Sequence, residues 1–337
     1  MLSILIPTYN REDTLNKLIS FIERTYINNK IEYEVEILIG NDYPEKISIV
    51  KSEVKNLAIT VFNNEKNLGE AGNLNYLLSL AKHPYVVWLF DDDSIDPCFF
   101  CYFQDVIDGI KHFDVFLFQC SKNSQDSIYR DESIVSRNEF KLTNGKDFAI
   151  AGQYANFIGF VAIYNRRSVL DIGGVTKLSN QPIAVGSEYD LIFQAIKFDR
   201  IVLSDAKLIR VCLHTGSYSS SVLDYIPFYE SGINLYKRSI SDDIVKIFPN
   251  NNQPYLEFLL FFVTTNVLNR AFSTLKIKDS FKIFDNFIFE LNKYDSVYCF
   301  DKKYILIKAI VYSFFVSIYK RIVPLKLRLF ISIRLRK

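Results

Sequence analysis

The sequence predicts an α/β fold in which helices cover both faces of a mainly parallel β-sheet, followed by a helical C-terminal extension. Over the first third of the chain, apolar runs of strand length alternate with amphipathic stretches. The runs are almost continuously apolar, as expected for parallel strands that are buried on both faces. Near residue 225 the composition changes, and aromatic, apolar and basic residues dominate. We therefore expect two parts, 1–225 and 226–337.

The expected strands and helices follow from this alternation. The expected strands are 2–7, 33–42, 57–64, 85–93, 114–120 and 200–214, the last as one strand or two. The expected helices are 13–26, 69–83, 166–177 and 186–198. In 13–26 the apolar residues recur at helical spacing, and Asp13 or Thr14 is placed to cap the N-terminus. Gly173 and Gly174 end the third helix, and acidic residues occupy the first turn of the fourth.

The composition indicates a folded protein. Hydrophobic residues make up 49% and charged residues 23% of the 337 positions, which suits a sizeable core and argues against disorder. Cys98 and Cys101 form a CxxC pair, but no second pair completes a zinc site. We therefore expect reduced thiols and a reducing compartment. The N-terminal apolar run breaks at Pro7 and has no basic segment before it, so we predict no signal peptide.

The net charge of +2 conceals an asymmetry between the body of the chain and its C-terminus. Residues 302–337 contain ten Lys or Arg and no acid, which leaves the other 301 residues with a net charge of −8. An aromatic, basic segment of this kind is typical of an interfacial amphipathic anchor on an anionic membrane surface. The apolar run 304–319 is only sixteen residues long and contains Lys308, so a spanning helix is the weaker alternative. A helical subdomain that packs on the first part is a further alternative, mainly for 225–300.

Polar segments follow three of the expected strands, in "PTYNR", "GNDYPE" and "FDDDS". Ligands of open α/β sheets bind at the carboxyl ends of the strands, so we expect these segments to converge. Asp91, Asp92 and Asp93 repel one another, and a hard divalent cation that holds a phosphorylated ligand offsets this repulsion. The spacing does not fit an EF-hand calcium loop, and adjacent residues cannot flank a glycosidic bond as a glycosidase pair does. An ordinary solvated loop is the remaining alternative.

Six segments follow one another within residues 1–222: "SILIPTYNREDTLNKLI", "EILIGND", "NLGEAGNLN", "VVWLFDDDSIDP", "GG" before "GSEYDL", and "RVCLHTGSYS". In this order they resemble the inverting family 2 glycosyltransferases of the GT-A fold, which is Rossmann-like. The resemblance implies transfer of a sugar from a nucleotide-diphosphate donor to an acceptor. It also implies a divalent cation, Mn²⁺ or Mg²⁺, on the diphosphate.

The resemblance assigns one group of residues to the nucleotide-sugar donor. The first loop corresponds to the base and ribose pocket, Asp42 to an acid that hydrogen-bonds the base, and "NLGEAGNLN" to a segment that closes over the nucleotide. Asn41 stands where relatives often have a second acid, which leaves the identity of the base open. The residues implied for the donor are Pro7, Thr8, Tyr9, Arg11, Asp42, Gly69, Gly72, Asn73, Asp91 and Asp92.

The aspartates resemble the Asp-x-Asp motif of the family in two registers. Counting from the strand selects Asp91 and Asp93, whereas aligning on Pro97 makes Asp92 the second acid. His214 resembles a late histidine that contacts the metal or the diphosphate. The implied metal set is therefore Asp91, Asp92, Asp93 and His214.

Inverting transfer needs a general base that takes the proton of the acceptor hydroxyl. The resemblance places this base in "GSEYDL", where Glu188 stands in the register of the family's catalytic Asp and Asp190 is the runner-up. The alternative is that both acids only complement the dipole of the helix.

Together, these features predict a metal-dependent inverting glycosyltransferase of hexosyl or N-acetylhexosaminyl type, with a UDP-sugar favoured as donor. The expected acceptor is a glycan on a polyprenyl-diphosphate lipid, in the assembly of a bacterial surface polysaccharide such as an O-antigen or capsule. We expect a peripheral position on the cytoplasmic face of the inner membrane, through 302–337, and no nucleic-acid partner. The alternatives are a nucleotidyltransferase, which usually carries a Gly-rich basic loop that "PTYNRE" lacks, and an inactive sugar-nucleotide-binding module.

Overall fold

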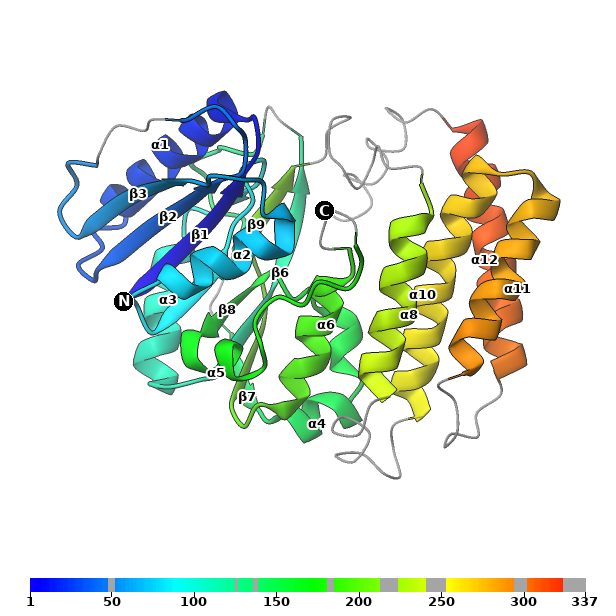
Figure 1. The fold of residues 1–337 in the computed structure, drawn as a ribbon. Coiled ribbons are helices and arrows are strands. Elements are labelled where there is room, and N and C mark those ends of the chain that lie inside the picture. Colours follow the sequence, from blue (N-terminus) through cyan, green and yellow to red (C-terminus); the bar gives the residue numbers. More distant parts are fainter. Residues whose placement is uncertain are drawn as a thin grey trace.

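Figure 1 shows the computed structural model as an α/β part followed by a group of helices. The structure describes residues 1–47, 52–124, 127–135, 139–180, 185–212, 224–240, 253–293 and 302–323. The N-terminus lies at the sheet, and helices of the C-terminal third stand beside the α/β part (Figure 1).

The described strands form one mixed sheet in the order β3-β2-β1-β4-β8-β6-β9-β5, with β7 paired to β9. Strands β3, β2, β1 and β4 are parallel, as are β6 and β9, whereas β8 runs antiparallel to both β4 and β6. The predicted α/β architecture is therefore confirmed, but the sheet is mixed: four of the described strand pairings are parallel and four are antiparallel. The bounds are β1 (Leu2–Thr8), β2 (Val35–Asn41), β3 (Leu57–Asn63), β4 (Tyr85–Trp88), β5 (Ser94–Ile95), β6 (Val115–Asn123), β7 (Lys141–Thr143), β8 (Ala162–Asn165) and β9 (Ile201–Cys212).

Helices cover both faces of the sheet. One apolar cluster joins the sheet to α1 and α3, and another joins it to α2, α6, α8 and α10. The bounds in the α/β part are α1 (Glu12–Asn28), α2 (Gly69–Leu80), α3 (Phe99–Ile110), α4 (Gly145–Ile150), α5 (Arg166–Asp171) and α6 (Ser187–Gln194), with short 3₁₀ turns η1 (Gln153–Asn156) and η2 (Ala195–Lys197). The later helices are α8 (Ile226–Ile240), α10 (Gln253–Thr274), α11 (Ile277–Asn292) and α12 (Lys302–Ile322).

The expected helical extension is present, and it packs on the α/β part. Leu235 of α8 and Leu259 of α10 belong to the same buried cluster as Leu191 of α6. In the described part of the chain, each helix falls short of the length or the apolar character that crossing a membrane requires.

Several boundaries differ from those expected. The strand predicted for 85–93 ends at Trp88, and the aspartates follow in a turn in which Asp93 N–H bonds to Phe90 O at 3.0 Å. The helix expected from Arg166 ends at Asp171, so the prediction that Gly173 and Gly174 end it is confirmed, and both glycines have left-handed backbone. Segment 201–212 forms one strand, whose pairing with β6 is interrupted by a bulge. The expectations did not include α3 or β8.

Candidate active site

A cavity of about 790 Å³ opens where β1, β2 and β4 end and is closed on its other side by α6, α8 and α10. The three polar segments that were expected to converge do meet here. The expected site residues that line the cavity are Pro7, Thr8, Tyr9, Arg11, Asp42, Gly69, Asn73, Asp91, Asp92, Asp93 and Glu188. Gly72 and Asp190 are not part of the lining, and His214 lies outside the described residues.

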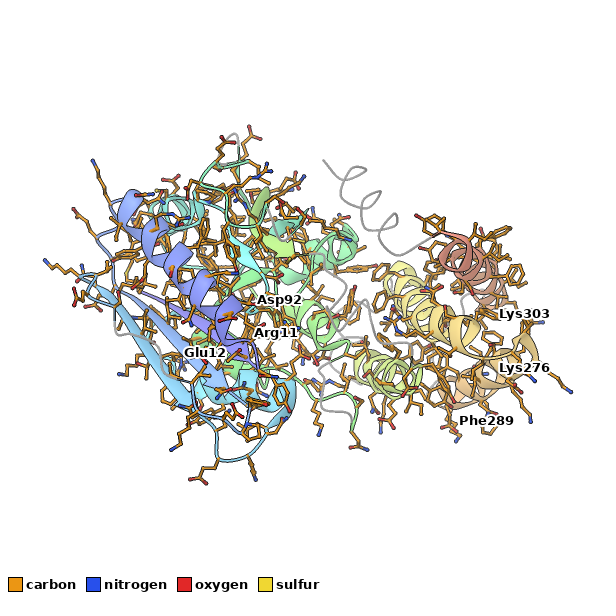
Figure 2. The ribbon with its side chains drawn as sticks, turned by 90° about the horizontal axis from the view of Figure 1, so that it is seen from above. Arg11, Glu12, Asp92, Lys276, Phe289 and Lys303 are labelled. Atoms are coloured by element: carbon orange, nitrogen blue, oxygen red, sulfur yellow. The ribbon has the colours of Figure 1, made fainter. Side chains whose placement is uncertain are left out.

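Arg11 and Thr8 organise the first two aspartates. Arg11 Nη1 donates to Asp91 Oδ1 at 2.9 Å and to Asp92 Oδ2 at 2.7 Å. Figure 2 shows Arg11 and Asp92 next to each other. Thr8 Oγ1 donates to the other oxygen of Asp91 at 2.6 Å. The contacts are possible because β1 and β4 are parallel neighbours, so the segments that follow them meet. One guanidinium thus bridges two carboxylates and offsets their repulsion.

Asp93 is held differently from its two neighbours. Its Oδ1 accepts the backbone N–H of Cys212, at the end of β9, at 3.0 Å. Burial raises the pKa of Asp93 well above its ordinary value, and the charge of Asp92 raises it further. Burial also raises the pKa of Asp91, although its bonds to Thr8 and Arg11 oppose this. A nearby cation would therefore favour the ionised form of Asp93.

A second polar network holds Asp42 at the end of β2. Asp42 Oδ1 accepts Asn64 Nδ2 at 2.6 Å, and its carboxylate also accepts backbone N–H groups at the start of α2. Asn64 Nδ2 also donates to Asn73 Oδ1 at 3.2 Å, and Asn73 Nδ2 donates to Gly40 O at 2.7 Å. A side chain at Gly40 would not fit, because its Cβ would lie 2.1 Å from Asn73 Oδ1. Gly40 therefore lets α2 approach the strand end that carries Asp42.

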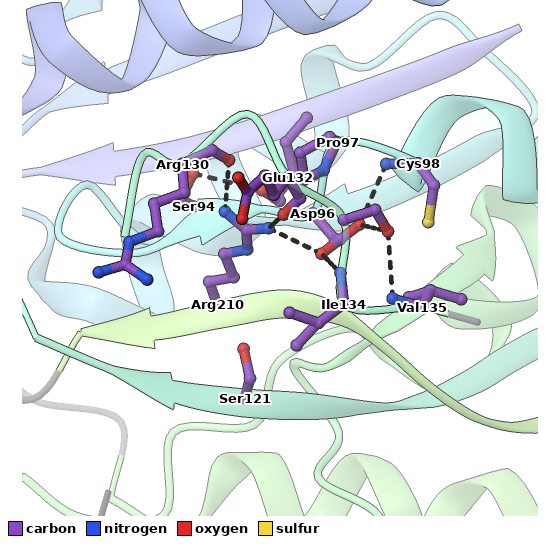
Figure 3. Close-up of polar contacts among 12 residues, drawn as sticks. Ser94, Asp96, Pro97, Cys98, Ser121, Arg130, Glu132, Ile134, Val135 and Arg210 are labelled. Atoms are coloured by element: carbon purple, nitrogen blue, oxygen red, sulfur yellow. Dashed lines mark hydrogen bonds and ion pairs between the residues drawn. The ribbon is translucent and has the colours of Figure 1, made fainter. Parts of the chain in front are cut away.

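A buried ion pair supports the turn that contains the aspartates (Figure 3). Arg210 Nη2 donates to Asp96 Oδ2 at 2.9 Å, and both side chains are buried. Asp96 Oδ1 also accepts the backbone N–H of Cys98 at 3.1 Å, and Arg210 Nη1 donates to Arg130 O at 2.6 Å. Because β5 pairs with β9 directly after Asp93, this network ties the aspartate turn to the end of β9.

Glu188 stands on the first turn of α6, at the cavity wall. Burial raises its pKa to about 7, and the negative charge of Glu70 on α2 adds to the shift. Gly159 allows α6 to sit this close to the preceding loop, because a Cβ there would lie 2.2 Å from the backbone oxygen of Glu188. A carboxyl group that titrates near neutral pH at the edge of a cavity can exchange a proton with a ligand.

Asp190 faces away from the cavity and joins α6 to α8. Its two carboxylate oxygens accept Nε and Nη2 of Arg238 at 3.0 and 3.2 Å. Its side chain is 2% exposed, so the pair is a structural contact between two helices. Of the two acids considered for the base, Glu188 is the one at the cavity.

Several lining residues were not foreseen from the sequence. Glu70 lies inside "NLGEAGNLN", directly after Gly69, and the fold brings its charge to the same cavity as Glu188 of α6. Phe228 of α8, together with Phe262 and Arg270 of α10, comes from the part of the chain that was expected to form a separate extension. Only the tertiary packing brings these helices to the cavity.

Known proteins resemble this chain in sequence and in structure. The sequence profile described as "Glycosyl transferase family 2" matches residues 3–173. A Haemophilus influenzae protein described as "Uncharacterized glycosyltransferase" is 30% identical over 97 residues, which are 29% of this chain and 31% of that protein. The chain thus spans about a third of the length of that curated relative.

Two solved structures share the fold of this chain. The structure of S. aureus TarS 1-349 in complex with UDP-GlcNAc has a TM-score of 0.53 at 17% identity, covering 87% of this chain and 91% of that chain. The structure of S. aureus TarS 1-349 has a TM-score of 0.54 at 16% identity, covering 95% and 91%. At these identities the likeness shows the fold alone, which agrees with the expected GT-A fold. Since the family profile covers just over half of the residues, the chain belongs to glycosyl transferase family 2.

Proposed function

We propose that this protein transfers a sugar from a nucleoside-diphosphate donor to a hydroxyl group of a glycan acceptor, with inversion at the anomeric carbon. One observation carries the proposal: a single cavity joins the aspartate turn, the loop after β1 and the carboxyl group of Glu188. The UDP-GlcNAc bound by the TarS structure supports a UDP-sugar as the first donor to test. A hexosyl or N-acetylhexosaminyl group is the proposed cargo.

The donor is assigned to the end of the cavity nearest the sheet. Asp42 presents an acceptor for an N–H group of the base, and its network with Asn64 keeps that carboxylate in place. Tyr9 lines the cavity together with Asp42, and its ring packs edge to face on Tyr43, the residue after Asp42, with ring centroids 5.3 Å apart. An exposed aromatic ring beside a hydrogen-bond acceptor is suited to a planar base.

Glu188 is the proposed general base. Its carboxylate takes the proton of the acceptor hydroxyl while the hydroxyl oxygen forms a bond to the anomeric carbon. The bond between that carbon and the diphosphate oxygen breaks, and the nucleoside diphosphate leaves with both electrons. A base with a pKa of about 7 suits this step, because it is partly ionised at neutral pH and still binds a proton well.

The charge of the lining fits a divalent cation. Among the described lining residues, six carboxylates face two guanidiniums, a formal charge of −4: Asp42, Glu70, Asp91, Asp92, Asp93 and Glu188 against Arg11 and Arg270. Such a lining repels a diphosphate, and carboxylate oxygens are suitable ligands for Mg²⁺ or Mn²⁺. No three His, Cys, Asp or Glu side chains of the described residues form a metal-binding group by themselves, so donor oxygens are expected to complete the site. We assign Asp93, with Asp91 or Asp92, to hold the cation, which stabilises the leaving diphosphate as a Lewis acid when bound.

Release of nucleoside diphosphate tests the proposal directly. Purified protein is incubated with a panel of UDP- and GDP-sugars, and free nucleoside diphosphate is measured with and without EDTA. We expect release from at least one donor, with loss in EDTA and recovery on addition of Mn²⁺ or Mg²⁺. Pyrophosphate release from a sugar phosphate and a nucleoside triphosphate would instead indicate a nucleotidyltransferase. Full activity in EDTA would contradict the metal assignment.

We further propose that the protein acts on a lipid-linked acceptor while bound peripherally to the cytoplasmic face of a bacterial membrane, in surface-polysaccharide assembly. The supporting surface is the outer stripe of α12, where Tyr304, Ile307, Phe315 and Ile322 are exposed at helical spacing. Lysines accompany it, and Figure 2 shows Lys276, Phe289 and Lys303 on the side of the molecule remote from Asp92. An exposed apolar stripe with basic neighbours is suited to an anionic headgroup region.

Vesicle sedimentation tests this surface. We expect the protein to sediment with phosphatidylglycerol vesicles and less with neutral ones, and the double variant Ile307→Asp with Phe315→Asp to remain in solution. Ile134→Asp is the matched control, because Ile134 is a similarly exposed residue of the α/β part. Unchanged sedimentation of the double variant would contradict the proposed surface.

A further inference from the structure

The cavity continues beyond Glu188, where helices of the extension form its wall. Residues of α8 and α10 face the same space as the aspartate turn, among them Phe228, Ser231, Phe262 and Arg270. The lining at this end is mainly apolar and aromatic, in contrast to the acidic end at the sheet. The two ends therefore select for different chemical groups.

Arg270 brings a positive charge to this wall and is held in place there. Its guanidinium carbon lies 3.2 Å from the centroid of the Phe228 ring, so the planar group stacks on the aromatic face. Nη1 also reaches the backbone oxygen of Asn266 at 3.3 Å and its Oδ1 at 3.4 Å. A guanidinium fixed in this way loses little conformational freedom when it binds a planar carboxylate or a phosphate.

Aromatic rings extend this wall toward Glu188. The rings of Tyr189, the next residue in the chain, and Phe262 lie with centroids 3.9 Å apart, and both line the cavity. Ser231 lines the same wall, and its buried hydroxyl has no hydrogen-bond partner in the part of the chain that the structure describes. Rings beside a few polar groups form a surface on which an oriented ligand packs.

We propose that α8 and α10 form the acceptor subsite, and that it takes a saccharide carrying a negatively charged group, a phosphate or a carboxylate, which Arg270 contacts. The inference rests on the proposed function, because it takes the donor to occupy the opposite end. Glu188 lies between the two ends, where a base must stand to reach an acceptor hydroxyl. The aromatic wall packs on the sugar ring, and Arg270 selects the charged substituent.

Binding of matched probes tests the subsite. The probes are n-octyl β-D-glucoside, n-octyl β-D-glucuronide and the 6-phosphate of the glucoside, each below its critical micelle concentration and titrated by calorimetry into protein saturated with UDP and Mn²⁺. We expect the wild type to bind at least one anionic probe about tenfold to a hundredfold more tightly than the neutral one, because this is the gain in affinity that a charge-assisted hydrogen bond gives. The glucuronide and the phosphate separate the two sources of charge.

The variants Arg270→Gln and Arg270→Lys locate this preference. Arg270→Gln is expected to bind all three probes about equally, and Arg270→Lys to recover part of the preference. Arg167→Gln, which removes an exposed positive charge from α5, is the matched control and is expected to behave as the wild type. The affinity for UDP and the melting temperature report whether each variant folds.

Two outcomes overturn the subsite. One is wild-type binding that does not distinguish the neutral from the anionic probes, including no binding of either. The other is an Arg270→Gln variant that keeps the wild-type preference. In both cases the proposed function stands if the wild type still releases nucleoside diphosphate from a donor, whereas a protein that releases none refutes the proposed function itself.

Discussion

Replacing Glu188 with Gln should reduce transfer and stabilise the protein at alkaline pH. The change keeps the shape of the side chain and removes the base, so we expect kcat to fall by about 10²–10⁴-fold at pH 8. Wild-type kcat/KM should rise with pH to a plateau, with a midpoint near the pKa of about 7 of Glu188. The measurement is nucleoside-diphosphate release with an acceptor present, from pH 5.5 to 9.

The same pKa sets the effect on stability. The pKa of Glu188 is about 7 in the folded protein, whereas the ordinary pKa of a glutamate is 4.5. The protonated group therefore contributes fully to the free energy of unfolding below pH 4.5, and this contribution is lost as the pH rises through 7. At 1.36 kcal/mol per pKa unit, the loss is at most about 3 kcal/mol. The Glu188→Gln variant has no group that titrates here and does not lose this stability. The free energy of unfolding of the variant, relative to that of the wild type, should therefore increase between pH 5 and pH 8.

Asp190→Asn is the matched control for these two measurements. It alters an acid on the same helical turn, but one that pairs with Arg238 rather than lining the cavity. We expect a lower melting temperature and an unchanged pH midpoint of kcat/KM. The reasoning is refuted if Glu188→Gln keeps more than about a tenth of the wild-type rate, or if Asp190→Asn abolishes transfer in a folded protein.

Three further substitutions test the surroundings of the site. Glu70→Gln removes a charge that raises the pKa of Glu188, so the pH midpoint of kcat/KM should move to lower pH; an unmoved midpoint contradicts this. Asp96→Asn leaves the buried Arg210 without its counter-charge, and urea unfolding should show a loss of roughly 3–5 kcal/mol; a loss under 1 kcal/mol would count against the pair. Gly159→Ala forces α6 away from its loop, so kcat should fall by about 10²-fold while the Kd for UDP stays within threefold; an unchanged kcat disproves this positioning.

The sequence predicts the first half of the sheet well because each element there has one unambiguous period. Strands β1 to β3 and helix α1 agree with the expected ranges to within about two residues. By contrast, β8 has only four residues, too few to show a clear strand period. The buried apolar residues of α3 do recur at helical spacing, Phe99, Phe103 and Val106 among them, so this helix was missed although the sequence carries its pattern. The end of β4 was placed too late because its apolar run continues through Phe90, although pairing with its neighbours stops earlier.

The site was predictable where it depends on strand ends and was not where it depends on packing. Asp42, Asp91 and Glu188 follow from motifs at the ends of strands or the start of a helix. The contacts that hold Arg11 between two aspartates join residues about 80 positions apart, and no local pattern shows them. Arg270 is even farther along the chain from the aspartates. It belongs to an aromatic, apolar helix whose sequence does not indicate that the helix lines a cavity.

The cavity also crosses the boundary that composition suggests near residue 225, and this leads to a last prediction. A fragment of residues 1–225 should not fold stably by itself. It lacks six buried apolar residues of the core that it shares with α8 and α10: Leu235, Tyr236, Leu259, Leu260, Val263 and Val267. At about 1.5–3 kcal/mol each, their burial contributes on the order of 9–18 kcal/mol, as much as the whole stability of an ordinary domain. We expect the fragment to bind a hydrophobic dye and to unfold without cooperativity, whereas the full chain unfolds in one sharp transition. A fragment that unfolds cooperatively and binds UDP as tightly as the full chain would show that the helices only adjoin the site, and that the cavity wall they form is dispensable.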